Sequence, residues 1–319
     1  MAASVTSSTA TRETGRGAEA RRVSGRRPNR AGLGIAAFLA PAVAIYAIFV
    51  LYPILQSMRY SLYEWSGIAP GFAFVGLANY ATLLHDATFW RALSNNAILV
   101  VASIAIQLPV GLALALLVST KLRGLRFFRT VYFFPLLMST VAIGLLWNYI
   151  YDPTFGLLNV TLDAIHLTGL QRGWLGEQGT ALGAVIAVIC WQFIPFYMVL
   201  FIAGLTTIPP ELNEAARLDG AGGGRLFWSI TLPLLRGVIR TAAILSLIGS
   251  LKYFDLIYVM TGGGPNDATQ LMATYMYKQA FTQFALGYGS TVAVALFLIA
   301  FVVTAVILYL DQFRAARDG

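Results

Sequence analysis

Charged side chains are scarce in this chain, since Asp, Glu, Lys and Arg make up 11% of its 319 residues. Soluble globular domains carry about 25% charged residues. Apolar and aromatic residues make up 58% of the chain, and the mean hydropathy is +0.71. This composition excludes an ordinary soluble fold and predicts an integral protein of the lipid bilayer. The net charge of +8 is then a signal of membrane topology rather than of nucleic-acid binding.

Cysteine, histidine and nucleotide-binding motifs are also nearly missing. The one cysteine, Cys190, lies in an apolar run, which excludes an intramolecular disulfide and a cysteine-based metal site. The two histidines, His85 and His166, stand alone, and no H-E-x-x-H or G-x-S-x-G motif occurs. No phosphate-binding G-x-x-x-x-G-K-[ST] loop occurs in the sequence. The glycine run Gly222–Gly224 is not such a loop, because Lys and then Ser or Thr do not follow it. The sequence therefore predicts a non-enzymatic chain without a metal or cofactor of its own. The energy that drives such a chain is therefore expected to come from a partner protein or from an ion gradient.

Long apolar stretches are what the chain has in abundance. About 20 apolar residues cross a bilayer as a helix. Stretches of this length lie at 33–55, 97–118, 130–150, 182–208, 238–260 and 287–310. They predict an all-α, six-span bundle over residues 33–310. The basic tail 1–32 lacks apolar periodicity and is expected to be disordered, and 311–319 forms a short C-terminal tail. The first stretch continues to Leu55, which is longer than a signal-peptide core and predicts an uncleaved first span.

The distribution of basic residues predicts the orientation. Seventeen of the 22 Lys and Arg residues lie in the two tails and in the segments 119–129 and 209–240. The intervening segments on the opposite side hold four, namely Arg59, Arg91, Arg172 and Lys278. Cytoplasmic loops carry the excess of Lys and Arg in membrane proteins. Both termini and the 209–240 segment are therefore expected in the cytoplasm.

The three external segments carry helix and turn signals. Large apolar side chains at helical spacing predict an interfacial helix over Asn79–Asn95. Turn residues in 151–181 predict a small cap over the external mouth of the bundle. The run Thr261–Asp267, which contains Gly-Gly-Gly-Pro-Asn-Asp, predicts a tight, exposed turn.

Prolines occur inside three of the predicted spans. Pro109, Pro135 and Pro195 each lack a backbone donor and tend to kink a helix. Such breaks are tolerated in a membrane where neighbouring helices or a cavity satisfy the freed carbonyls. They indicate bent helices around an internal space.

A polar insert, 209–235, interrupts the apolar pattern. Pro209 and Pro210 suit the first turn of a helix, and the residues that follow form a small-faced helix ending near Gly220. The run Gly222–Gly224 then predicts a hinge before a second, apolar helix. A helix with so little side-chain bulk is suited to being gripped by another protein.

The insert also resembles a known motif. Glu214-Ala215-Ala216 is followed after three residues by Gly220, and after nine more by Ile230-Thr231-Leu232-Pro233. This spacing resembles the EAA loop of permease subunits of binding-protein-dependent ABC importers. From about residue 33 to 310 the chain is similar to sugar-type permeases of the maltose-permease kind. Further matching positions are Tyr52-Pro53, Gly76-Leu77-Ala78-Asn79-Tyr80, Phe89-Trp90, Asn159, Phe254-Asp255 and Thr261-Gly262-Gly263-Gly264-Pro265.

The resemblance implies an assembly in the plasma membrane of a prokaryote. This chain and a related, non-identical second permease subunit would form the path for a carbohydrate or polyol-like solute. A cytoplasmic ABC ATPase dimer would bind ATP and Mg, and an extracytoplasmic solute-binding protein would deliver the solute. The implied ATPase-coupling residues are Glu214, Ala215, Ala216, Asp219, Gly220, Ile230, Leu232 and Pro233. The triple glycine at 222–224 is richer than the family pattern.

Polar residues inside the spans are the candidate substrate path. A charge at bilayer depth costs about 3 kcal/mol on insertion scales. Lys252 and Asp255 are three residues apart, so they are expected to share a helix face and neutralise each other. Aromatic faces beside hydrogen-bonding groups suit a polyhydroxylated ligand, as similar permeases show. The candidate path residues are Trp191, Gln192, Tyr197, Lys252, Tyr253, Asp255 and Tyr258.

Two alternatives stay open at this point. Lys252 and Asp255 could be a structural pair at a helix interface with aromatic residues packed around it. They could also serve as the relay of an ion-coupled secondary transporter. Inverted repeats typical of such transporters are not evident in the sequence.

Overall fold

The computed structural model describes residues 30–68, 70–119 and 125–315. Most of the predicted basic tails and the start of the 119–129 loop lie outside the described residues. The chain divides into two units, 1–53 and 54–319. The described part of the first unit is helical, with α1 (Arg30–Tyr46) and a π-helical turn, η1 (Ala47–Leu51), before α2 (Tyr52–Tyr60) begins.

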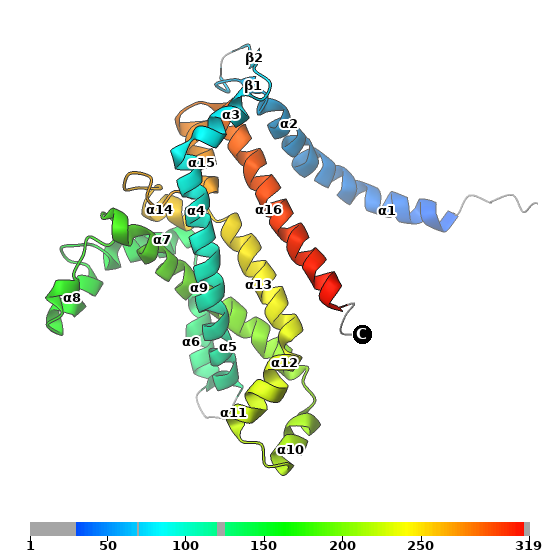
Figure 1. Ribbon diagram of the computed structural model, residues 1–319, viewed down its shortest axis with the longest axis vertical. Coiled ribbons are helices and arrows are strands. Elements are labelled where there is room, and N and C mark those ends of the chain that lie inside the picture. The colour runs from blue at the N-terminus through cyan, green and yellow to red at the C-terminus, as the bar shows by residue number, and fades with distance from the viewer. Residues whose placement is uncertain (1–29, 69, 120–124, 316–319) are drawn as a thin grey trace, which may run out of the picture. The chain divides into compact units, whose positions relative to one another are not determined.

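The second unit consists mainly of helices (Figure 1). It contains one short antiparallel hairpin, in which Tyr63 pairs with Phe74 and Glu64 with Ala73. In chain order its elements after α2 are β1 (Tyr63–Glu64), β2 (Ala73–Phe74), α3 (Ala78–His85), α4 (Ala87–Ala102), η2 (Ser103–Gln107), α5 (Leu108–Val118), α6 (Leu125–Leu137), α7 (Thr140–Ile150), α8 (Leu157–Ala164), η3 (Thr168–Leu170), α9 (Gln178–Thr206), α10 (Pro210–Leu218), α11 (Gly223–Leu226), η4 (Phe227–Thr231), α12 (Leu232–Leu234), α13 (Arg236–Leu251), α14 (Asp255–Met260), α15 (Met272–Tyr277), η5 (Lys278–Thr282) and α16 (Leu286–Ala315).

Several of these helices are long and apolar enough to cross a membrane. Four uninterrupted segments qualify among the described residues, namely Ala37–Tyr60, Ala87–Val118, Gln178–Thr206 and Leu286–Ile307. Two further segments qualify as bent pairs, with bends of 113° between α6 and α7 and 65° between α12 and α13. The predicted all-α membrane class is confirmed, and the described residues contain four helical segments long and apolar enough to be spans, or six if each bent pair is one span.

Two predicted spans are not continuous helices. The stretch 130–150 turns sharply after Leu137, two residues beyond Pro135. The stretch 238–260 breaks between Leu251 and Asp255. By contrast, α9 continues through Pro195 without interruption. Proline therefore marks the break after Leu137 but not the one after Leu251. Neighbouring helices decide where a helix can break, because they supply hydrogen bonds to the freed backbone groups.

Other predicted boundaries need correction as well. Helix α1 begins at Arg30 and α16 continues through Ala315, so helix extends two or more residues beyond the predicted span region 33–310 at each described end. The interfacial helix expected over Asn79–Asn95 is two helices, α3 and α4, which meet at Asp86. The turn over Thr261–Asp267 is present, but only Gly262 and Asn266 in it are exposed and Gly263 is buried, so the expected exposure was only partly right.

Helix α9 is the centre of the second unit. It is apolar on all sides, as expected of a helix surrounded by others, and its buried residues contribute to two apolar clusters along its length. Helix α5 approaches it closely at Gly111, where an added Cβ would lie 3.0 Å from Cβ of Tyr197 and 3.2 Å from the backbone nitrogen of Met198. Small residues allow such close backbone approach between membrane helices.

The break between α13 and α14 is held by an asparagine from α4. Asn96 is fully buried, and its Nδ2 donates to the carbonyls of Ser250 and Leu251 at 3.0 and 3.4 Å. Its Oδ1 accepts from the backbone N–H of Met272 at 2.8 Å, the first residue of α15. One amide thus satisfies the end of one helix and the start of another, which allows the chain to leave helical geometry inside the bundle.

A second polar junction joins α4 to α15 and α16. Asp86 caps α4, with Oδ1 accepting from the backbone nitrogens of Thr88 and Phe89 at 2.8 and 3.3 Å. Its Oδ2 accepts from the hydroxyls of Tyr275 and Tyr288. Burial alone would raise the pKa of Asp86, but these four hydrogen bonds outweigh it and hold the pKa below its usual value.

Replacing Asp86 by alanine is expected to lower the unfolding free energy by about 1–3 kcal/mol, from the lost helix cap and the unpaired tyrosine hydroxyls. Because the folded-state pKa lies below the unfolded one, the stabilisation is present above about pH 4 and is lost as the pH falls through the folded value. Thermal unfolding of the purified protein at several pH values measures this. The matched control is Asp163→Ala, which removes an exposed carboxylate on α8. Equal unfolding temperatures for Asp86→Ala and wild type would contradict the expectation.

Candidate functional site

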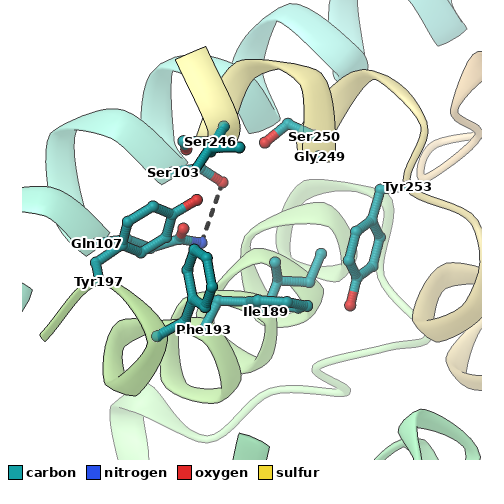
Figure 2. Close-up of a pocket in the computed structure, with 11 residues that line it drawn as sticks. Ser103, Gln107, Ile189, Phe193, Tyr197, Ser246, Gly249, Ser250 and Tyr253 are labelled. Carbon is teal, nitrogen blue, oxygen red and sulfur yellow. Dashed lines mark hydrogen bonds between the residues drawn. The ribbon is translucent and has the colours of Figure 1, made fainter. Parts of the chain in front are cut away.

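A cavity of about 190 Å³ lies beside the middle of α9. It is lined by residues of the π-helical turn η2, of α9 and of α13, and by Tyr253 in the break after α13 (Figure 2). The two apolar clusters of the core lie on either side of it along α9, because Ile189 belongs to one and Tyr197 to the other. Its lining residues are Ser103, Gln107, Ile189, Phe193, Phe196, Tyr197, Leu245, Ser246, Gly249, Ser250 and Tyr253.

Four polar side chains, Ser103, Gln107, Ser246 and Ser250, contribute to the lining of this mostly apolar cavity. Ser103 and Gln107 are one turn apart on η2, and Nε2 of Gln107 donates to Oγ of Ser103 at 3.2 Å (Figure 2). Ser246 and Ser250 are four residues apart on α13, which places them on one helix face. Ser246 is 2% exposed, and its Oγ makes no hydrogen bond of ordinary geometry among the described residues, although the hydroxyl of Tyr197 interacts with it. These hydroxyls can pair with a ligand that has its own donors and acceptors.

One wall of the cavity is aromatic. Phe193, Phe196 and Tyr197 come from α9, and Tyr253 comes from the break after α13. Rings of Phe193 and Tyr253 meet edge to face, with centroids 6.0 Å apart. No charged side chain lines the cavity. Aromatic faces opposite hydroxyl and amide groups, without a charge, suit a neutral polyhydroxylated molecule.

The structure brings together only part of the predicted path. Tyr197 and Tyr253 line the cavity, and Gln192 lies behind Tyr253, whose hydroxyl donates to its Oε1 at 3.5 Å. Trp191 does not line it and packs on Trp147 instead, with ring centroids 5.5 Å apart. Tyr258 does not line the cavity either. It stacks on Phe254 and is 46% exposed.

The predicted pairing of Lys252 and Asp255 is wrong. Helix α13 ends at Leu251, and Asp255 is the first residue of α14, so the two side chains do not share a helix face. Both are exposed, the described residues show no ion pair between them, and neither lines the cavity. The spacing argument failed because Asn96 ends α13 where sequence periodicity continues it.

Sequence reasoning missed the four polar residues of the cavity. Ser103 with Gln107, and Ser246 with Ser250, are both polar pairs at i, i+4 in apolar stretches. Such a pair marks one polar face of a membrane helix. This pattern is present in the sequence, but it does not reveal that the two pairs, 139 or more residues apart in the chain, line the same cavity.

The insert 209–235 forms the helix–turn–helix that its sequence predicted. Helix α10 is exposed on most of its surface, including Glu214, Ala215 and Asp219. Ala216 is 9% exposed, so it supports the turn rather than the open face. The helix ends with Gly220 at φ +81°, where Gly220 donates to the carbonyl of Arg217 at 3.0 Å and Ala221 to that of Ala216 at 2.9 Å. This is the Schellman arrangement, which favours glycine at that position.

The triple glycine is not the hinge that was predicted. Gly222 precedes α11, and Gly223 and Gly224 are its first helical residues. The helix then continues through η4 to α12, which contains Leu232 and Pro233, while Ile230 lies half-buried in η4. The turn rests on Gly220 and its hydrogen bonds, so α11 through α12 form one connected arm between α10 and α13.

Comparison with known proteins decides the family. Residues 107–315 match the family described as binding-protein-dependent transport system inner membrane component. This chain belongs to that family. The permease is 42% identical over 264 residues to the Probable ABC transporter permease protein YurN of Bacillus subtilis, covering 82% of this chain and 90% of that protein.

Other relatives of the permease carry sugar names. It is 35% identical over 294 residues to the diacetylchitobiose uptake system permease protein NgcF of Streptomyces coelicolor, covering 89% of this chain and 83% of that one. It also resembles in fold a bacterial alginate ABC transporter solved with an alginate pentasaccharide-bound periplasmic protein. The TM-score is 0.78 and the identity 20%, over 89% of this chain and 95% of that one. The comparisons give no support to the ion-coupled alternative.

Proposed function

We propose that the permease forms part of the translocation path for a neutral carbohydrate or polyol-like solute, and that the cavity beside α9 binds that solute in transit. The observation that carries the proposal is the cavity at the middle of α9, which no charged side chain lines and in which aromatic rings lie near the buried hydroxyls of Ser103, Ser246 and Ser250. Uptake permeases for diacetylchitobiose and for trehalose and maltose are among its relatives, which supports a sugar.

A second permease subunit would complete the cavity. Its open side lies where Phe196 and Leu245 are 38% and 41% exposed, and apolar side chains at membrane depth need either lipid or protein beside them. A related chain there would close the wall around the solute. Six spans with both termini in the cytoplasm agree with the distribution of Lys and Arg.

The insert would couple the bundle to a separate ATPase dimer that holds ATP and Mg. Glu214, Ala215, Asp219 and Gly220 present an exposed face on α10, and the arm from α11 to α12 leads from it into α13. Displacement of α10 would therefore reach Ser246 and Gly249 of the cavity through one chain of helices. An extracytoplasmic solute-binding protein would deliver the solute to the opposite side.

Reconstitution tests the proposal. The permease, its second permease subunit, the ATPase and the binding protein are placed in liposomes with ATP, and uptake of labelled solutes is measured. Uptake of a neutral oligosaccharide is expected, at least about tenfold above an acidic uronate oligosaccharide or glycerol phosphate, because burying an unpaired charge in the cavity is unfavourable. The matched control replaces ATP by a non-hydrolysable analogue. Gradient-driven uptake by this chain alone, without ATP, would contradict the proposal.

A further inference from the structure

A second cavity, of about 410 Å³, lies between α4 and the first turns of α9. We call it the outer cavity, and the cavity proposed to bind the solute is called the solute cavity. Residues that line the outer cavity include Arg91, Asn95 and Ile98 of α4 and Gln178, Gly183 and Ile186 of α9. Both helices begin in segments that the distribution of Lys and Arg predicts to be external. The outer cavity therefore lies on the side from which a binding protein would deliver the solute.

The outer cavity and the solute cavity follow one another along the same helices. On α9, Ile186 lines the outer cavity and Ile189 lines the solute cavity, so about 4.5 Å of helix axis separates them. On the other side, Ile98 of α4 lines the outer cavity, and Ser103 of the adjoining η2 lines the solute cavity. The two cavities share no lining residue. A solute that left the outer cavity along α9 would reach the solute cavity next.

Two adjacent asparagines of α4 hold the walls of the two cavities. Asn96 donates to the carbonyl of Ser250, which lines the solute cavity. Asn95 lines the outer cavity, and its Nδ2 donates to the carbonyls of Ala268 and Gln270, each at 2.9 Å. Asn95 is 6% exposed, yet its Oδ1 accepts no hydrogen bond among the described residues and is not fully covered by protein. This Oδ1 is an acceptor held in a fixed position and available to a hydroxyl group in the outer cavity.

Arg91 and Gln178 supply hydrogen-bond donors to the same cavity. One guanidinium nitrogen of Arg91 donates to the carbonyl of Asn266 at 3.0 Å, which leaves the N–H groups of the other nitrogens for a ligand. Gln178 is the first residue of α9, and its exposed side chain makes no hydrogen bond among the described residues. Its amide can both donate and accept. These groups, with the apolar side chains of Ile98 and Ile186, suit a molecule that carries hydroxyl groups on a carbon ring.

The charge of Arg91 does not require an acidic ligand. Arg91 is exposed, so water solvates its guanidinium group. Two carboxylates in neighbouring segments already have partners. Glu177 accepts from a backbone nitrogen at 2.7 Å, and Asp267 forms an ion pair with Lys278 at 2.7 Å. Arg91 already donates to an uncharged oxygen, the carbonyl of Asn266, and sugar hydroxyl and ether oxygens are acceptors of the same kind.

We infer that the outer cavity is a second binding site for the hydroxylated solute, which occupies it after release from the binding protein and before the solute cavity. The inference rests on the proposed function, because it names an earlier stage of the same path. Arg91, Asn95 and Gln178 bind hydroxyl groups of the solute there. Gly183 leaves room for its ring, since an added Cβ at this position meets no atom within 4 Å.

Filling the outer cavity tests the inference. In liposomes that contain the complete importer, Gly183→Leu is expected to reduce ATP-driven uptake of a neutral oligosaccharide about fivefold or more, the equivalent of at least one lost hydrogen bond. The matched control is Ala187→Leu, which adds bulk one turn further along α9 at an exposed position outside both cavities. It should leave uptake within about twofold of wild type. Loss of the second permease subunit from both variants would show a helix interface on this face and overturn the inference.

A kinetic measurement separates a solute site from a docking surface for the binding protein. Gln178→Leu is expected to lower the maximal uptake rate about fivefold, with no change in the concentration of loaded binding protein that gives half that rate. The matched control, Gln283→Leu, makes the same change at an exposed external position outside both cavities and should change neither value. A changed half-saturating concentration with an unchanged maximal rate would identify a docking surface and overturn the inference. If Gly183→Leu does not assemble, this measurement decides alone.

Gly249→Leu, which fills the solute cavity, separates this inference from the proposed function. Normal uptake by Gly183→Leu beside reduced uptake by Gly249→Leu would overturn the outer site and leave the solute cavity standing. Normal uptake by both variants would contradict the proposed function as well. Reduced uptake by both, in complexes that assemble like wild type, is the result expected if the solute occupies the two cavities in turn.

Discussion

Replacing Gly249 by leucine is expected to reduce solute uptake by about tenfold or more, because the new side chain occupies the space in which a sugar ring would contact the aromatic wall. Gly249 lines the cavity, and a Cβ added there meets no atom within 4 Å, so the leucine enters the cavity without disturbing α13. Leucine is also a better helix former than glycine, by about 1 kcal/mol at most. Uptake into the reconstituted liposomes, with ATP hydrolysis measured in parallel, checks the expectation.

The matched control makes the same change elsewhere on α13. Gly237→Leu also adds a side chain into open space, but Gly237 does not line the cavity. It should leave uptake within about twofold of wild type, as expected of surface substitutions away from special features. Normal uptake by Gly249→Leu, in complexes that assemble as well as wild type, would show that the solute does not pass through this cavity.

Replacing Gly220 by valine is the second change with a large expected effect. The position has φ +81°, and left-handed backbone costs a residue with a Cβ about 1–2 kcal/mol, more for a β-branched one. The Schellman hydrogen bonds to Arg217 and Ala216 would be lost or distorted, and α10 would change its direction relative to α11. We expect uptake to fall about tenfold or more, since 1.4 kcal/mol is a factor of ten, while ATP hydrolysis continues. The ratio of solute transported to ATP hydrolysed measures this coupling.

Two variants serve as controls for this experiment. Gly222→Val introduces the same side chain two residues later, where φ is −69° and the space is open, and should keep uptake near wild type. Gly220→Asn should retain most of the coupling, because asparagine tolerates the left-handed conformation. If Gly220→Val transports as efficiently as Gly222→Val, the turn after α10 does not determine coupling.

Features that depend on adjacent residues could be predicted from the sequence. Hydropathy located the apolar stretches. Pro209 and Pro210 at its start and Gly220 after its end marked the limits of α10, because caps and turns depend on a few adjacent residues. The motif at 214–233 pointed to the family that the comparisons show. Its role in coupling stays a prediction, which the Gly220 variants address.

Contacts between residues far apart in the chain could not be predicted from the sequence pattern. Lys252 and Asp255 are a helical pair by spacing, yet Asn96, 154 residues away from Ser250, ends the helix between them. Asp86 is an ordinary polar residue in an external segment until Tyr275 and Tyr288 donate to it from more than 180 residues away. The hydrogen bonds of the Ser250 carbonyl and of the Asp86 carboxylate depend on partners that sequence periodicity does not identify.

The sequence by itself determined that this chain is a mainly helical membrane protein with a polar insert and no phosphate-binding loop, because hydropathy, turn chemistry and motif spacing are local properties. Only the tertiary structure decided where α13 breaks, and which residues enclose the uncharged cavity beside α9. That cavity arises where Ser103 and Gln107 of one helical segment face Ser246 of another, with α9 closing the third side. Packing of helices distant in sequence brings these groups together, since no pattern within a single helix specifies its neighbours.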